Sequence, residues 1–296
     1  MNWKFLSPLF CIVVLAGCST TSRETQISDA RDEISTKTNR IFVSAQVNAK
    51  PVRFIFDTGA DVAYLTAQTA QRLGLRTSPS THPTDKWMVG VTQESFLTLN
   101  GSLRKQVFPV IDLTGPDAAH FPAGGFLGWL CYRNTIFRID AANLSVTAYN
   151  RVPEDVKTWQ KFRLRPDSTK FIFEVPLPNG VTGEVFVDTG ASDGVGLYPD
   201  QWRAWKTANP NLRMSLHQAY MPYRRTGLIM QEVTLADKVV LGPLTLTKLP
   251  VMETSPAANA HYDPRRRLAT MGMAALRRMD VLVDNRHGFV YLRPKP

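Results

Sequence analysis

Two copies of the tetrapeptide Asp-Thr-Gly-Ala stand in this chain, at residues 57–60 and 188–191. Each copy directly follows a short apolar run of β-forming residues, Phe54–Phe56 in the first copy and Val185–Val187 in the second. A single Asp-Thr-Gly is weak evidence, because it is usually only a strand end entering a turn. Two matched copies predict two aspartates that work as a pair.

A pair of close carboxyl groups can activate water. Two carboxyl groups within about 3 Å of each other cannot both ionise cheaply, so they share a proton and their apparent pKa values separate. The ionised group takes a proton from a water held between them, while the protonated group hydrogen-bonds the carbonyl under attack. This chemistry needs no metal ion and no covalent enzyme intermediate. We therefore predict Asp57 and Asp188 as catalytic residues, with no cofactor and no metal.

The elements around the two motifs also repeat. An alternating strand pattern begins at Ile41, 16 residues before Asp57, and another begins at Phe171, 17 residues before Asp188. Gly59 and Gly190 suit loops whose backbones approach each other closely, because a side chain there would obstruct the approach. Short helices are expected near 67–73 and 199–208.

On these residues the chain resembles the retropepsin and pepsin family of aspartic proteases, with two retropepsin-like lobes fused in one polypeptide. The resemblance covers most of residues 41–296. It implies an all-β, bilobal pepsin-like fold in which each lobe is a small closed barrel or folded sheet. Because one chain supplies both motifs, we expect a monomer to be sufficient for catalysis.

The resemblance also assigns supporting roles. It implies that Thr58 and Thr189 cross-link the two loops through their hydroxyl groups. Gly128 and Gly272 are implied to mark strands packed beneath the loops, although Thr270 replaces a large aliphatic residue in the second copy. A cover over the substrate is normally a hairpin, and the candidates are residues 87–91 and 220–227.

The first residues resemble a bacterial lipoprotein signal. Lys4 precedes an apolar run, Phe5–Ala16, that is too short to span a bilayer. The end of this run continues into Leu-Ala-Gly-Cys, which ends at Cys18. We expect residues 1–17 to be a signal peptide and Cys18 to be lipidated; an ordinary cleaved signal is the alternative. Ser19, rather than Asp, implies an anchor in the outer membrane that faces the periplasm.

The remaining boundaries follow from the two repeats. Residues 18–40 are expected to comprise the lipidated cysteine and a flexible tether, because the segment after the cysteine is polar; a short helix is the alternative. Residues 41–150 are the expected N-terminal lobe, 151–168 the connection between lobes, and 169–296 the C-terminal lobe.

Composition limits the other classes. The chain has 296 residues, 35 Lys plus Arg, 25 Asp plus Glu and 44% hydrophobic residues, which excludes a disordered or multi-span membrane protein.

Arginine clusters at 224–225, 265–267 and 277–278 suit lipid headgroups or an acidic substrate, or are simply solvated surface. The histidines lack metal-ligand spacing, and nothing resembles a nucleic-acid reader. Cys131 is expected to be a buried apolar side chain.

We therefore expect a lipid-anchored envelope aspartic endopeptidase that acts on an extended protein or peptide segment. The alternative from another class is a catalytically silent, peptide-binding lipoprotein that serves as an envelope scaffold or adaptor. An enzyme with the same aspartate pair and a non-peptide substrate is a third reading.

The alanines that end both motifs lead to a prediction about pH. Ala60 and Ala191 have no hydroxyl group to donate to the carboxylates, and such a bond would lower the carboxyl pKa. We expect activity at mildly acidic to neutral pH, and we expect the Ala60→Ser, Ala191→Ser double variant to lose its shared proton at lower pH. The measurement is the pH–rate profile of both proteins. The fall in rate on the high-pH side of the profile reports loss of the shared proton. If this fall does not move to lower pH in the variant, the hydrogen-bond argument is wrong.

Overall fold

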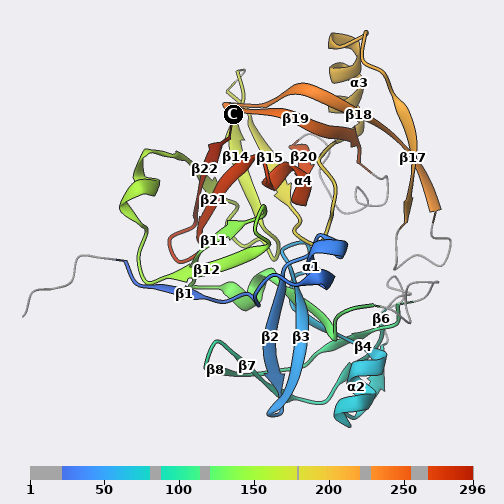
Figure 1. Ribbon diagram of the computed structural model, residues 1–296, viewed down its shortest axis with the longest axis vertical. Coiled ribbons are helices and arrows are strands. Elements are labelled where there is room, and N and C mark those ends of the chain that lie inside the picture. Colours follow the sequence, from blue (N-terminus) through green and yellow to red (C-terminus); the bar gives the residue numbers. More distant parts are fainter. Residues whose placement is uncertain are drawn as a thin grey trace, which may run out of the picture.

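The computed structural model describes residues 22–80, 88–113, 121–178, 180–220, 228–254 and 266–295. In these residues the chain is mainly β, and its strands gather in two sheets (Figure 1). This is the all-β, pepsin-like fold predicted from the sequence. Both sheets are open series of strands, so the described residues form folded sheets and no closed barrel.

The smaller sheet carries the first motif. Its nine strands are arranged in the order β5-β6-β9-β4-β10-β3-β2-β7-β8. They are β2 (Phe42–Val47), β3 (Lys50–Asp57), β4 (Ala63–Thr66), β5 (Thr77–Pro79), β6 (Met88–Thr92), β7 (Ser95–Leu99), β8 (Ser102–Gln106), β9 (Pro109–Ile111) and β10 (Gly125–Gly128).

The larger sheet carries the second motif. Its thirteen strands are arranged in the order β1-β12-β11-β21-β22-β13-β14-β15-β20-β16-β19-β18-β17. They are β1 (Glu24–Gln26), β11 (Ile136–Asp140), β12 (Ser145–Tyr149), β13 (Gln160–Leu164), β14 (Ile172–Pro176), β15 (Thr182–Val187), β16 (Val195–Leu197), β17 (Ser215–Tyr220), β18 (Leu228–Leu241), β19 (Leu244–Glu253), β20 (Arg267–Met271), β21 (Met279–Asp284) and β22 (Phe289–Pro294).

The helices are short and lie around the sheets. They are α1 (Glu33–Thr38), α2 (Ala67–Leu73), α3 (Pro199–Ala208) and α4 (Met273–Leu276), with 3-10 turns η2 (Trp129–Tyr132) and η3 (Glu154–Thr158). The predicted helices at 67–73 and 199–208 are α2 and α3. Gly74 ends α2 in the left-handed conformation, at φ 72°, which favours glycine. In the described part of the chain, every helix is too short or too polar to cross a membrane.

The two halves of the chain are joined through the larger sheet. Strand β11 of the first half pairs with β21 of the second, and Ile136 lies opposite Asp284. The predicted boundary at residue 150 therefore does not separate the sheets, because β11 and β12 lie in the larger one. Between the halves, the ring of Trp129 stacks on that of Phe171 at 4.8 Å and 11°.

The predicted tether over 18–40 is wrong for residues 22–40, and residues 18–21 lie outside the described residues. Strand β1 pairs with β12, and α1 is the short helix of the alternative. Arg53 of β3 holds this segment through ion pairs with Asp29, at 3.1 Å, and with Asp32, at 2.7 Å. These partners could not be predicted from the residues of the segment itself, because Arg53 and β12 are distant from it along the chain.

The predicted connection at 151–168 contains secondary structure of its own. It contains η3 and β13, and β13 pairs with both β22 and β14. The connection thus contributes one strand, β13, to the larger sheet.

A buried ion pair lies where β15 meets β20. Glu184 and Arg267 are each 3% exposed, and the guanidinium Nε of Arg267 lies 3.1 Å from the carboxylate of Glu184. Arg165, which is partly exposed, lies 3.1 Å from the same oxygen. Arg267 belongs to a predicted cluster at 265–267, so this arginine is structural and is not solvated surface.

Removing the acid should destabilise the fold strongly. Glu184→Gln leaves the Arg267 charge buried without its counter-ion, and we expect a loss of about 3 to 5 kcal/mol in the free energy of unfolding. Asp200→Asn, which breaks the exposed pair with Arg203, is the control and should cost less than about 1 kcal/mol. Urea unfolding measures both. Equal losses in the two variants would contradict the importance of the buried pair.

Candidate active site

The two aspartates lie at equivalent points of the two sheets. Asp57 is the last residue of β3, beside the parallel strand β10, where it lies opposite Gly128. Asp188 directly follows β15, and its N–H donates to the carbonyl of Met271 in the parallel strand β20 at 2.9 Å. Parallel neighbours thus fix the backbone just where each motif leaves its strand.

Reciprocal hydrogen bonds hold the two motifs together. The Thr58 N–H donates to Thr189 Oγ1 at 3.0 Å, and the Thr189 N–H donates to Thr58 Oγ1 at 3.1 Å. Each hydroxyl then donates onward to a carbonyl of the opposite half: Thr58 to Val187 at 2.7 Å, and Thr189 to Phe56 at 2.8 Å. Because both threonines are fully buried, these bonds are shielded from competing water.

The glycines of the two motifs allow the closest approach. A Cβ atom at Gly59 would lie 2.5 Å from Asp188 Oδ1, and a Cβ atom at Gly190 would lie 2.5 Å from Asp57 Oδ1. Real Cβ contacts are not that short, so only glycine lets each backbone pass the opposite carboxyl group. The symmetry of the two distances shows that the loops are related as a matched pair.

Two further glycines lie beneath the loops. A Cβ atom at Gly128 would lie 2.3 Å from the Val62 carbonyl oxygen, and one at Gly272 would lie 2.5 Å from that of Asp193. The residues that follow them donate to the loops: Trp129 N–H to the Ala60 carbonyl, and Met273 N–H to the Ala191 carbonyl, both at 2.9 Å.

The surroundings raise the pKa of both aspartates. For Asp188, burial is the main cause, and the charge of Asp57 and a hydrogen bond with its carboxyl group add to it, which raises the pKa to about 7. Burial also raises the pKa of Asp57, but N–H donors oppose that shift. Both residues remain only half-buried, so water can reach them.

The two carboxyl groups are not equivalent. Asp57 Oδ1 accepts from the N–H groups of Gly59, at 2.8 Å, and Ala60, at 3.2 Å, whereas Asp188 Oδ1 accepts from Gly190 at 2.8 Å. Donors stabilise the charged form of an acid. The negative charge therefore favours Asp57, and the shared proton favours Asp188.

Two cations near this pair were missed in the sequence. Lys170 Nζ donates to the carbonyl oxygen of Gly59 at 2.5 Å, and the positive charges of Lys170 and Arg40 both oppose the rise in the Asp188 pKa. Each cation lies two residues before the first strand of its repeat, Arg40 before β2 and Lys170 before β14. The residue after each accepts an equivalent bond: Ile41 O from Phe56 N–H, and Phe171 O from Val187 N–H, both at 2.9 Å. Superposing the two repeats would have revealed them.

The flap candidates fall partly outside the described residues. In the first, Trp87 lies outside, and 88–91 belong to β6, which is paired between β5 and β9, so these four residues are a strand and not a hairpin tip. In the second, 221–227 lie outside. Tyr220 pairs with Leu228, which makes β17 and β18 the two arms of a hairpin around that candidate.

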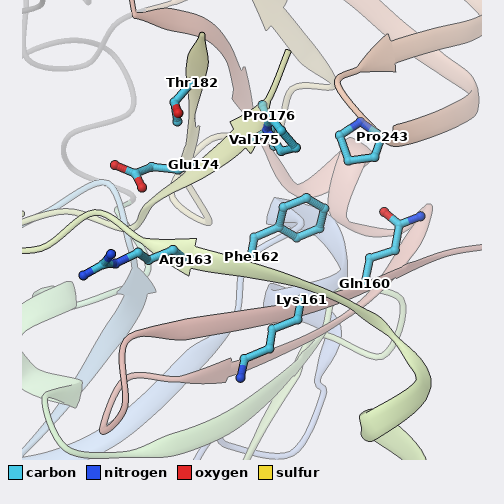
Figure 2. A pocket seen from close by; sticks show the side chains of 9 residues that line it. All are labelled: Gln160, Lys161, Phe162, Arg163, Glu174, Val175, Pro176, Thr182 and Pro243. Atoms are coloured by element: carbon cyan, nitrogen blue, oxygen red, sulfur yellow. The ribbon is translucent and has the colours of Figure 1, made fainter. Parts of the chain in front are cut away.

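The other candidate sites in the described part of the chain do not bring reactive groups together. A pocket of about 490 Å³ opens where β13 and β14 diverge, but its charged side chains, such as Arg163 and Glu174, do not converge on it (Figure 2). Burial raises the pKa of the Cys131 thiol to about 11, which keeps it protonated at neutral pH. No group of three metal-ligating side chains occurs among the described residues. Cys18 lies outside them.

Comparison with known proteins agrees with this geometry. Residues 43–121 match the family model described as Aspartyl protease. No curated protein matches the chain. The match to residues 43–121 supports an aspartyl protease domain of the retropepsin-like kind in the first half of the chain, and a protease-like function at that level.

Removing one hydroxyl of the cross-link should loosen the site. Thr58→Val keeps the side-chain shape but leaves the Thr189 N–H and the Val187 carbonyl without their buried partner, so the free energy of unfolding should fall by roughly 2 to 4 kcal/mol. Thr58→Ser keeps the hydroxyl and should retain most of that stability. Urea unfolding of the two variants tests this. A valine variant as stable as the serine variant would show that the cross-link contributes little.

The raised pKa of Asp188 predicts how stability depends on pH. Between the usual pKa of 3.8 and about 7, the unfolded chain has lost a proton that the folded chain keeps, so the free energy of unfolding falls as the pH rises through this range. The full decline is on the order of 4 kcal/mol. In Asp188→Asn the decline should be much smaller. An equally steep decline in this variant, measured by urea unfolding from pH 4 to pH 7, would contradict the assignment.

Proposed function

We propose that this protein is a lipid-anchored aspartic endopeptidase of the bacterial cell envelope, with Asp57 and Asp188 as its catalytic residues. The observation that carries the proposal is a pair of carboxyl groups in hydrogen-bonding contact, one raised in pKa to about 7, and both accessible to water. A proton shared in this way supplies an acid and a base at the same place.

The mechanism follows from the difference between the two groups. Asp57, which accepts two N–H bonds, is the better anion and takes a proton from the attacking water. Asp188 holds the shared proton and donates it to the scissile carbonyl oxygen. The water oxygen bonds to the carbonyl carbon to give a tetrahedral intermediate. When the intermediate collapses, the carbon–nitrogen bond breaks, the proton on Asp57 passes to the leaving nitrogen, and a hydroxyl group of the intermediate returns a proton to Asp188 as the carbonyl re-forms.

Hairpin strands and the N-terminal residues indicate the substrate and the location. We propose an extended protein or peptide segment as the substrate, because β5 with β6 and β17 with β18 pair as antiparallel arms, and hairpins can cover such a segment. The position of Cys18 at the end of the apolar run supports a lipid anchor in the envelope, and Ser19 supports the outer membrane, facing the periplasm. The protein acts as a monomer, since one chain supplies both aspartates.

The test is cleavage of a peptide library by the purified mature chain. Asp57→Asn should lower kcat by roughly a hundredfold or more, because the water loses its base. Asp237→Asn, an exposed change on β18, is the control and should retain full activity.

Two outcomes would contradict the proposal. No cleavage at any pH by the wild-type chain would favour a peptide-binding scaffold. Cleavage that persists in Asp57→Asn would remove this aspartate from the mechanism.

A further inference from the structure

The described chain enters the fold at the outer edge of the larger sheet. The Arg23 N–H donates to Asn150 Oδ1 at 2.9 Å, and the Asn150 N–H returns a bond to the Arg23 carbonyl at 3.3 Å. From there β1 pairs along β12, with Glu24 opposite Tyr149. The chain is thus fixed to the folded body from Arg23 onward.

This attachment leaves very little chain for a tether. The next step rests on the lipidation of Cys18 proposed above. Five residue steps separate Cys18 from Arg23, and a fully extended chain covers at most about 3.6 Å per residue, or about 18 Å in all. Whatever the conformation of residues 19–22, this edge of the sheet must stay close to the bilayer that holds the anchor.

The same edge is basic. We call Arg23, Arg133, Arg151 and Arg286 the entry corner. Arg286 donates to the carbonyls of Asn150, at 3.2 Å, and Asn134, at 3.5 Å, and these asparagines adjoin Arg151 and Arg133 in the sequence.

The charges of the entry corner are available to a partner. All four arginines are exposed, and none lies within ion-pair distance of an acid in the part of the chain that the structure describes. Of the nearby acids, Glu24 is exposed, while Asp284 is buried and bonded to His287. The local charge is therefore positive.

We propose that the entry corner docks on anionic lipid headgroups of the leaflet that holds the Cys18 anchor. Guanidinium groups match phosphate geometry, and basic residues kept within about a Debye length of an anionic surface are attracted to it. In Figure 1 the strand β1 lies on the opposite side of the molecule from β6 and β17. Docking of the entry corner thus turns β6 and β17, strands of the two hairpins proposed to cover the substrate, away from the bilayer and toward a substrate in solution.

The experiment uses the full chain, processed in a bacterial envelope and reconstituted on two kinds of vesicle. One contains phosphatidylglycerol in phosphatidylcholine and the other contains phosphatidylcholine alone. Mass spectrometry of the N-terminal peptide first tests for lipid on Cys18. Hydrogen exchange then measures the amides of 23–26 and 147–151, which should exchange on the order of tenfold more slowly on anionic vesicles and lose this protection in concentrated salt.

Matched variants separate the entry corner from net charge. Arg23→Gln, Arg133→Gln and Arg151→Gln together should abolish the protection, while the Arg286 bonds that organise the corner stay intact. Arg72→Gln, Arg76→Gln and Lys238→Gln remove the same charge from exposed positions elsewhere and should retain it.

Each contrary result overturns a stated part of the proposal. Lipidated protein with equal exchange on both vesicles overturns docking while leaving the anchor in place. An unmodified Cys18 overturns the anchor and docking together. Equal loss in both triple variants, or equal protection by inorganic phosphate on neutral vesicles, also overturns docking at the corner.

Discussion

The close approach of two acidic side chains, Asp57 and Asp188, is the constraint on which the rest of the structure depends. Two ionised carboxylates in contact would repel each other, and sharing one proton relieves that repulsion. The approach is possible because Gly59 and Gly190 have no Cβ atoms where the opposite carboxyl groups lie. The buried cross-link between Thr58 and Thr189 fixes it. The close carboxyl pair is therefore a property of two loops together and of neither loop alone.

A site built from two halves also requires the halves to keep one relative position. Pairing of β11 with β21 carries the larger sheet across from one half to the other, and stacking of Trp129 on Phe171 packs the halves against each other. Lys170 adds a direct contact from the second half to the Gly59 carbonyl of the first. These contacts connect the sheets to the two Asp-Thr-Gly-Ala loops. A change in packing between the halves would therefore alter the distance between the carboxyl groups.

Motifs that repeat within each half could be predicted from the sequence, whereas contacts between segments far apart along the chain could not. Each Asp-Thr-Gly-Ala copy carries its own strand and its own glycine step, so the fold class and the candidate pair Asp57 and Asp188 were predictable. The segment at 22–40 was predicted as a tether because its partners, β12 and Arg53, are remote in sequence. Lys170 was missed for a related reason: a single lysine before a strand has no signal until the opposite loop is in place. The resemblance left open whether each lobe is a closed barrel or a folded sheet, because strand order depends on long-range pairing that local patterns do not specify; the described strands form folded sheets.

The central claim is that Asp57 and Asp188 share one proton as a coupled pair. Carbon-13 NMR of the aspartate carboxyl carbons, recorded across pH in wild type and in Asp188→Asn, tests it most directly. A shared proton predicts a titration step near pH 7 that belongs to the pair and that disappears in the variant. If every aspartate in the wild-type protein titrates independently near the usual value of 3.8, the two carboxyl groups do not share a proton and the account is wrong.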